Sequence, residues 1–206
     1  MNKEKYGDVS TDRSLVLEIM SLIPEELFRD PTLKWLDPGA GGGIFSQVLY
    51  EKLLSFSPPE HIIKNMIYMV ECNPDNIILL RKRFGSEANI IEGDFLSWEP
   101  ECRFDMVIGN PPFNSGGLKK VPTNTKLDKK KDGKTIWRGF VRHAISLLKD
   151  GGRLNVIIPS LWMRRDRGGM HDYLKQYRLE KIHCFTNTET NKMFHGKAQT
   201  PTCYFI

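Results

Sequence analysis

Several features that would assign this chain to a familiar class are missing from its sequence. It has four cysteines, none of them in a Cys-x-x-Cys pair. No stretch approaches the roughly 18 consecutive apolar residues of a membrane span, and the polar start of the chain lacks the apolar core of a secretory signal. These absences argue against a zinc site, a disulfide scaffold and a membrane protein. We therefore expect buried free thiols, no bound metal and a reducing intracellular compartment, the cytoplasm.

The chain also lacks internal repeats and the length for two ordinary domains. Its 206 residues suit one compact domain of about 100–200 residues. We expect a single domain over residues 1–206, with no separate domain for recognising a partner.

Net charge is absent from the chain except in one segment. The formal net charge of the chain is +5, and the excess lies in residues 114–135. This segment has two aspartates against seven lysines: Lys119, Lys120, Lys126, Lys129, Lys130, Lys131 and Lys134. Its glycines and proline favour a mobile loop. A local basic patch suits a polyanionic partner such as nucleic acid, and a solvated surface loop is the alternative.

Short apolar runs alternate with helical patterns along most of the chain. Strands are expected at residues 33–36, 66–70, 90–91, 104–108, 153–158, 179–185 and 200–206. Helices are expected at residues 12–23, 44–54, 74–84, 135–148 and 170–177, and none between the last two strands. This order predicts a Rossmann-like α/β fold. Its mostly parallel seven-stranded sheet has helices on both faces and an antiparallel last strand. Ligands should bind beyond the carboxyl ends of the strands.

A glycine-rich segment follows the first expected strand. Residues 37–43 read Asp-Pro-Gly-Ala-Gly-Gly-Gly, which lets the backbone approach a ligand closely. The segment lacks both the Gly-x-Gly-x-x-Gly dinucleotide fingerprint and the Gly-Lys-Ser/Thr of a phosphate-binding loop. It favours a nucleotide-like cofactor, and a simple tight turn is the alternative.

Two acids follow the next two strands. Glu71 can accept hydrogen bonds from ribose hydroxyls, and Asp94 can hold an adenine amino group. Together with residues 37–45, they make the sequence resemble the S-adenosylmethionine-dependent methyltransferases over nearly its whole length. The resemblance implies S-adenosylmethionine as cofactor. It would be bound by Thr11, Asp37, Gly39, Ala40, Gly41, Glu71, Cys72, Asp94, Phe95 and Asn110.

The segment Gly-Asn-Pro-Pro-Phe follows the fourth expected strand. The lone pair of an exocyclic base amino group is delocalised into the ring. Two acceptors facing its N–H bonds, Asn110 Oδ1 and the Pro111 carbonyl, would draw that lone pair back onto nitrogen. Pro112 stiffens the turn, and Phe113 offers a ring on which a base can stack. The alternative is a proline-rich turn at a strand end.

The motif Asn110, Pro111, Pro112 and Phe113 resembles the catalytic signature of amino-methyltransferases that act on adenine N6, cytosine N4 or glutamine amides. Residues 7–16 precede the glycine-rich segment and look like the N-terminal cofactor motif of adenine-N6 DNA methyltransferases. That family usually has proline where Asp12 stands. A helix cap by Thr11 and Asp12 explains the same residues structurally.

The resemblance implies methyl transfer to adenine N6 in nucleic acid, DNA rather than RNA, as in restriction-modification. Beside Lys119, Lys120, Lys129, Lys130 and Lys131, we expect Arg164 and Arg165 to contact nucleic acid, and His195 lies where the family places a target-pocket loop. The chain ends within the seventh expected strand, so we expect that a partner or a deleted segment reads the target, or that the enzyme is poorly selective. RNA adenine methylation, protein glutamine methylation and an inactive cofactor-binding subunit are the alternatives.

Overall fold

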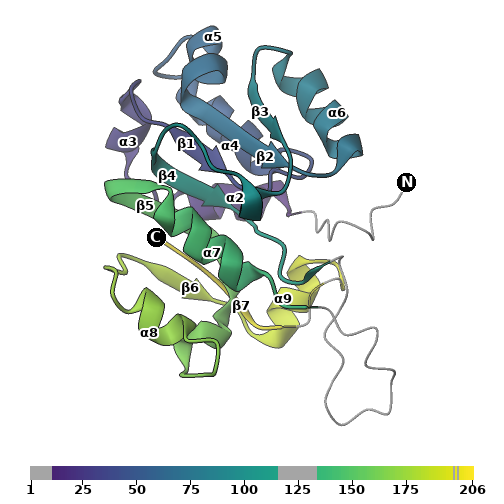
Figure 1. The fold of residues 1–206 in the computed structure, drawn as a ribbon, viewed down its shortest axis with the longest axis vertical. Helices are drawn as coiled ribbons and strands as arrows, with labels where there is room; N and C mark the ends of the chain where they lie inside the picture. Colours follow the sequence, from purple (N-terminus) through teal and green to yellow (C-terminus); the bar gives the residue numbers. More distant parts are fainter. Residues whose placement is uncertain (1–10, 116–133, 197, 199) are drawn as a thin grey trace.

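The computed structural model describes residues 11–115, 134–196, 198 and 200–206. Its centre is one seven-stranded sheet in the order β3-β2-β1-β4-β5-β7-β6 (Figure 1). Neighbouring strands pair in parallel except at β7, which runs antiparallel to both β5 and β6. The strands are β1 (Trp35–Asp37), β2 (Ile67–Glu71), β3 (Asn89–Glu92), β4 (Phe104–Gly109), β5 (Leu148–Pro159), β6 (Ile182–Cys184) and β7 (Thr202–Phe205). The mostly parallel sheet with an antiparallel last strand is confirmed.

Helices cover both faces of this sheet (Figure 1). The α-helices are α2 (Arg13–Met20), α3 (Glu25–Arg29), α4 (Ile44–Leu53), α5 (Pro59–His61), α6 (Pro74–Phe84), α7 (Trp137–Ser146), α8 (Met170–Leu174) and α9 (Asn187–Met193). A π-helical turn, η1 (Ile62–Met66), precedes β2, and two 3₁₀ turns, η2 (Phe95–Ser97) and η5 (Ser160–Met163), follow β3 and β5.

Successive strand residues point to opposite faces, and this alternation builds two hydrophobic cores. In β4, Met106 and Ile108 pack with α2, α4 and α6 on one face, while Val107 packs with α7 and α8 on the other. In β1, Trp35 and Leu36 divide in the same way. Because both faces are covered, the strands read as nearly continuous apolar runs, as expected for parallel strands.

Local signals set the ends of α6. The Asn73 side chain accepts a hydrogen bond from the Asp75 backbone N–H (3.1 Å), Pro74 takes the first helical position, and Gly85 ends the helix with φ of 86°. Each residue suits its place, because asparagine caps free N–H groups, proline lacks one, and glycine tolerates positive φ. The expected bounds of this helix are confirmed.

Several expected element boundaries were wrong, among them the ends of the helices expected over residues 12–23 and 170–177, which stop at Met20 and Leu174. The glycines at 151 and 152, expected to end a helix, lie inside β5, which starts at Leu148. Gly151 has φ of 77°, and the β4–β5 register shifts there, so the glycines form a strand irregularity. The expected edge strands are also too long, because β6 and β7 cover only residues 182–184 and 202–205.

A helix does lie between the last two strands, contrary to expectation. In α9, the Thr186 side chain accepts from the Glu189 N–H, and the Glu189 carboxylate accepts from the Thr186 N–H. This reciprocal capping box was visible in the sequence as Thr-x-x-Glu. The strands on either side of α9 still pair antiparallel.

The expectation of buried thiols holds for one cysteine. All four cysteines are free, but only Cys203 is buried, while Cys72 and Cys184 are exposed and Cys102 is half-buried. The exposed two lie just after β2 and on the edge strand β6, where the apolar run meets solvent. Within the described residues, no helix is long and apolar enough to cross a membrane, and no cluster of side chains suits a metal ion.

Candidate active site

The carboxyl ends of β1, β2, β3 and β4 lie side by side and are here named the carboxyl edge. Asp37 ends β1 and is 2% exposed. The Ser46 hydroxyl donates to its Oδ2 at 2.8 Å, whereas Oδ1 is buried without a hydrogen-bond partner among the described residues. Burial raises the pKa of Asp37 to about 7, against the lowering effect of Ser46.

The glycine-rich segment turns from β1 into α4 with two residues in the left-handed region. Gly41 has φ of 54° and Gly43 has φ of 84°, and a Cβ at Gly43 would come within 2.6 Å of the Leu80 side chain. Arg83 donates from Nη1 to the Gly42 carbonyl at 2.8 Å, holding the turn from α6. Glycine is therefore required at 43 by both backbone conformation and space.

Glu71 joins this turn to the end of β2. Its Oε2 accepts from the Gly41 N–H (2.6 Å), and its Oε1 accepts from the N–H groups of Cys72 (2.8 Å) and Asn73 (2.7 Å). Partial desolvation by the surrounding atoms and the neighbouring Glu71 charge raise the pKa of the thiol of Cys72, an exposed residue, to about 11, so it stays protonated at neutral pH. A carboxylate has about four acceptor positions, and three of those on Glu71 are used.

After β3, the Asp94 carboxylate caps a short helical turn, whereas the ring of its neighbour Phe95 is buried. Asp94 Oδ1 accepts from the Leu96 N–H at 3.0 Å and caps η2. The Phe95 ring is buried against α7, with ring centroids 5.1 Å from Phe140 and 4.8 Å from His143. Phe95 thus packs beneath this loop, and its expected contact with a cofactor stays a prediction.

The turn after β4 meets the glycine-rich turn. The strands β1 and β4 are hydrogen-bonded neighbours, and a Cβ on Gly109 would lie 3.1 Å from Asp37 Oδ1. Gly39 approaches in the same way, since a Cβ there would lie 3.6 Å from Pro112 Cδ. The expected cofactor loop and the expected catalytic turn are therefore in contact.

Two contacts at this turn were not expected from the sequence. Asn110 donates from Nδ2 to the Thr11 hydroxyl at 3.1 Å, and the Phe113 ring lies edge to face with Phe194 at 6.5 Å between centroids. His195 follows with φ of 50° and contacts Asp12, with 3.1 Å between Nε2 and Oδ1. The segment around Phe194 was noted for His195, but the sequence has no signal for the pairing of Phe194 with Phe113.

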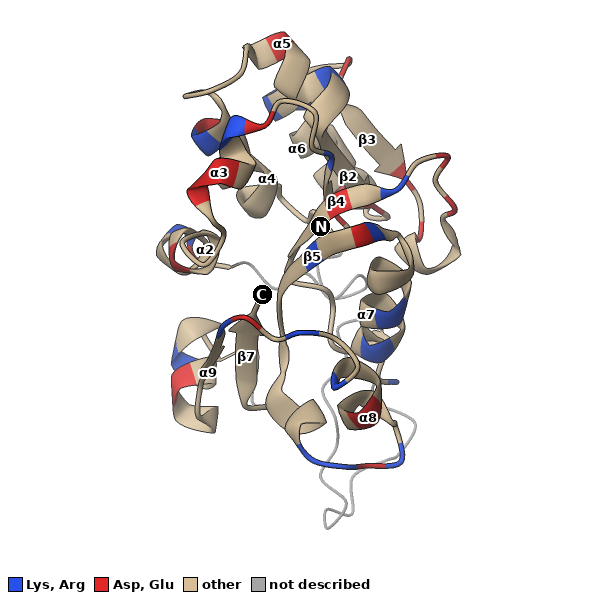
Figure 2. Cartoon of the chain, turned by 90° about the vertical axis from the view of Figure 1, so that its left-hand side faces the viewer, with Lys and Arg blue, Asp and Glu red and all other residues tan. Residues whose placement is uncertain are grey.

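Basic residues lie along α7 and on the loop that precedes α8 (Figure 2). Arg164 and Arg165 are exposed there, and Arg165 pairs with Asp172 at 3.2 Å. Two arginines of α7, missed in the sequence, join them: Arg138 pairs with Asp166, and Arg142 lies 4.1 Å from the ring centre of Tyr173. The expected contacts Lys119, Lys120, Lys129, Lys130 and Lys131 lie outside the described residues.

The backbone turn and the carboxylates at the carboxyl edge fit S-adenosylmethionine. A turn without side chains at residues 41–43 lies between the ends of β1 and β2, and a Cβ on Gly42 would meet nothing within 4 Å. Carboxylates at the ends of β2 and β3 are acceptors for the hydroxyl and amino donors of a nucleoside. Glu71 and Asp94 would hold the nucleoside of this cofactor beside the backbone of the glycine-rich turn.

Comparison with known proteins gives the family. Residues 10–194 match the Eco57I restriction-modification methylase family. The chain belongs to this family. S-adenosylmethionine, expected from the sequence, is the cofactor of these methyltransferases.

The most informative relatives are longer than this chain. The type II methyltransferase M.PaeR7I of Pseudomonas aeruginosa is 29% identical over 175 residues, which cover 72% of this chain and 30% of that protein. Ribosomal RNA small subunit methyltransferase C of Salmonella typhi is 29% identical over 167 residues, covering 77% and 42%. The chain thus spans less than half of either relative.

A solved structure shares the fold. The M protein of the type I restriction enzyme EcoKI superposes with a TM-score of 0.69 at 19% identity, covering 95% of this chain and 43% of that one. The Rossmann-like methyltransferase fold is therefore confirmed for this chain.

Proposed function

We propose that this chain transfers a methyl group from S-adenosylmethionine to an exocyclic amino group in nucleic acid, namely N6 of adenine in DNA. One observation carries the proposal: the Asn-Pro-Pro-Phe turn after β4 packs against the glycine-rich turn after β1. A methyl donor held at the second turn would lie beside an amino group held at the first.

The chemistry of the turn suits an amino acceptor. The Asn110 side-chain oxygen and the Pro111 carbonyl would accept the two N–H bonds of the amino group and return its lone pair to nitrogen. S-adenosylmethionine supplies an electrophilic methyl group. Alignment of nucleophile and methyl then accounts for much of the rate, up to about 7–11 kcal/mol for ideal placement.

The rings at the turn support a base as the substrate. Phe113 is half-buried, and the Phe194 ring lies nearly perpendicular to it at 6.5 Å between centroids, so the Phe113 ring is supported by the protein. A base leaving a duplex would stack on such a ring, as in enzymes that flip their target base.

The lysine-rich segment leaves and rejoins the described chain beside this turn. Ser115 donates from its backbone N–H to the Lys134 carbonyl at 2.8 Å, and the Ile136 N–H donates to the Phe113 carbonyl at 3.1 Å. Both ends of the segment that carries the seven lysines therefore lie next to the proposed position of the target base. With Arg164 and Arg165 these lysines would grip phosphates, which binds nucleic acid independently of sequence.

RNA is the second candidate, because the chain is also similar to a ribosomal RNA methyltransferase. We expect the target sequence to be read by a further subunit or segment. Protein glutamine is disfavoured, because a run of lysines suits phosphates better than a peptide. An inactive cofactor-binding subunit is disfavoured by the intact turn at Asn110.

The test is incubation with methyl-labelled cofactor and, in separate tubes, DNA, RNA or a glutamine-containing peptide. Low salt and excess substrate compensate for a missing recognition unit. We expect labelled N6-methyladenine in digested DNA, absent with Asn110→Ala. Label only in RNA or only in peptide would replace the proposed substrate. Cofactor binding without transfer to any of the three would favour the inactive subunit.

A further inference from the structure

Thr11, the residue before the N-cap of α2, is buried and contacts the turn after β4. It is 5% exposed, and its hydroxyl oxygen accepts a hydrogen bond from Asn110 Nδ2 at 3.1 Å. The two residues are 99 positions apart in the sequence. The contact is thus made only when the start of α2 packs against the end of β4.

Capping does not explain the burial of Thr11. The N-cap of α2 is Asp12, which makes no side-chain capping bond, and the first helical bond runs from the Val16 N–H to the Asp12 carbonyl. Asp12 thus takes the N-cap position that the sequence suggested, but the side-chain capping bond is absent. Within the described part of the chain, the Thr11 side chain hydrogen-bonds only to Asn110.

The orientation of the Asn110 amide decides what the turn presents. Its oxygen accepts hydrogen bonds and its nitrogen donates two, so a rotation of 180° would turn donors toward the N–H bonds of a target amino group. The amide N–H groups would then face the N–H bonds of the target and repel it. The oxygen acceptor that the proposed chemistry needs would point away from the substrate. One of the two ends must be held in place by the protein.

We propose that Thr11 is a positioning residue that holds the Asn110 amide with its oxygen toward the substrate. This rests on the proposed amino methylation. Thr11 engages Nδ2 through a lone pair, so its hydroxyl hydrogen remains available to another acceptor. Because the Thr11 oxygen accepts from Nδ2, the Oδ1 end of the amide points away from Thr11.

The neighbouring contacts support the same role. Asp12 meets His195 at 3.1 Å, and the residue before His195, Phe194, packs against Phe113. The start of α2 therefore braces both ends of the catalytic turn, Asn110 directly and Phe113 through Phe194. Among the described residues, the hydrogen bond from Asn110 to Thr11 is the polar contact that joins the start of α2 to Asn110.

The test compares Thr11→Val, which keeps the shape and removes the hydroxyl, with Thr11→Ser, which keeps the hydroxyl. Thr32→Val is the matched control, because the Thr32 hydroxyl donates to Asp30 Oδ1 at 2.7 Å far from this turn. With Thr11→Val we expect kcat to fall by up to roughly 100-fold, and cofactor affinity, measured by calorimetry, to fall much less. Thr11→Ser should restore most of the rate.

A second measurement does not depend on activity. The side-chain amide signal of Asn110, identified by its loss in Asn110→Asp, should shift in NMR spectra of Thr11→Val and stay in place with Thr11→Ser and Thr32→Val. An unmoved signal overturns the proposal, as does an equal loss of kcat and cofactor affinity or a failure of serine to rescue. If the unmodified chain transfers no methyl group at all, the proposed function fails, while this signal still tests the contact.

Discussion

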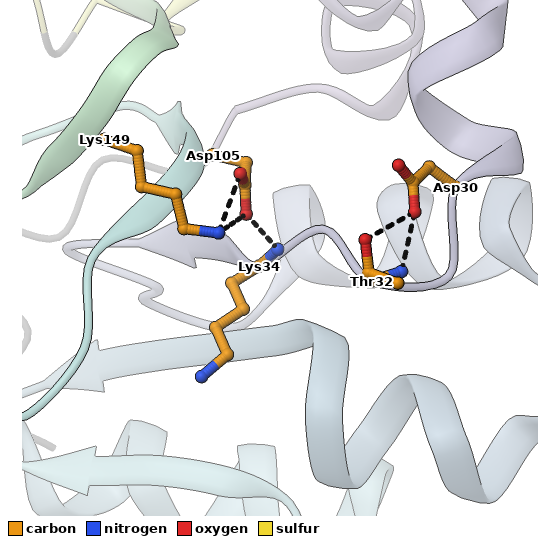
Figure 3. Close-up of polar contacts among 5 residues, drawn as sticks. All are labelled: Asp30, Thr32, Lys34, Asp105 and Lys149. Atoms are coloured by element: carbon orange, nitrogen blue, oxygen red, sulfur yellow. Dashed lines mark hydrogen bonds and ion pairs between the residues drawn. The ribbon is translucent and has the colours of Figure 1, made fainter.

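The two edges of the sheet use aspartate in opposite ways. At the amino edge, the start of β1, β4 and β5, Asp105 is fully engaged: Lys149 Nζ lies 2.9 and 2.8 Å from its two oxygens, and the Lys34 N–H donates at 2.8 Å (Figure 3). At the carboxyl edge, Asp37 is more deeply buried, yet one of its oxygens has no partner among the described residues. A satisfied carboxylate stabilises a fold, whereas an unsatisfied buried one costs free energy.

This difference indicates which edge is adapted for function. The contacts of Asp105 with Lys34 and Lys149 connect the starts of β1, β4 and β5. Nearby, Asp30 accepts hydrogen bonds from both the N–H and the hydroxyl of Thr32 (Figure 3). At the carboxyl edge, the burial that raises the pKa of Asp37 is unfavourable for folding alone. Perturbed groups of this kind concentrate where a ligand binds.

The largest expected effect is at the carboxyl edge. Asn110→Ala removes a proposed acceptor for the target amino group, and methyl transfer should fall by about a thousandfold or more. Cofactor affinity should persist, because the residues of the glycine-rich turn are untouched. Single-turnover kinetics and calorimetry check the two quantities separately.

Asn65→Ala is the control, since Asn65 is exposed and contacts only His61 among the described residues. It should leave transfer unchanged. An equal loss of transfer and cofactor binding in Asn110→Ala would show that Asn110 supports the structure of the site and does not act in catalysis.

The next effect is on stability and its pH dependence. The pKa of Asp37 is about 7 in the folded protein and about 4 in an unfolded chain. Between these values the folded state holds a proton that the unfolded state has lost, so stability falls as pH rises. Asp37→Asn should remove this loss, which is up to about 4 kcal/mol.

Urea unfolding at pH 5 and pH 8 measures it. The asparagine variant should gain stability relative to the unmodified chain at pH 8 and gain about a third as much at pH 5. If the difference between the two proteins is the same at both pH values, Asp37 is ionised in the folded state and the contrast with Asp105 is lost.

The amino edge should respond with the opposite sign. Asp105→Ala leaves the Lys34 N–H without its side-chain partner and should lower the free energy of unfolding by about 1–2 kcal/mol. Lys149→Ala removes only the ion pair of a half-exposed lysine and should cost less than about 1 kcal/mol. Neither should change cofactor affinity, and a marked change in affinity would mean that the two edges are coupled.

The sequence predicts those parts of the site that depend on neighbouring residues. The turn after β1 and the Asn-Pro-Pro-Phe turn are each defined by glycines and prolines within a few positions, and alternating apolar runs identify the strands between them. Strands ending at one edge of a parallel sheet then bring Asp37, Glu71 and Asn110 together, as the structure confirms.

Contacts between distant segments could not be predicted in this way. Thr11 meets Asn110 across 99 residues and His195 meets Asp12 across 183, and both depend on which strands become neighbours. The sequence predicted Phe95 as a loop residue beside a ligand. In the structure its ring packs in the core under α7, which covers this face of the sheet. Cys72 read as buried, but it lies one position beyond the last residue of β2.

The smallest effect concerns phosphate contacts and again compares the two edges. Replacing Lys129, Lys130 and Lys131 with alanine should weaken DNA binding and reduce the salt slope of log affinity by up to about 3, since each lost phosphate contact removes roughly 0.9. Arg164→Ala should reduce it by about 1 on the same basis. Lys149→Ala, at the amino edge, should leave the slope unchanged.

Titrations of DNA at several salt concentrations measure these slopes. Because the lost contacts are independent of sequence, the affinities for different DNA sequences should fall together. Equal slopes in all three variants would mean that the positive charge of the chain as a whole, and not the side chains beside the catalytic turn, attracts the DNA.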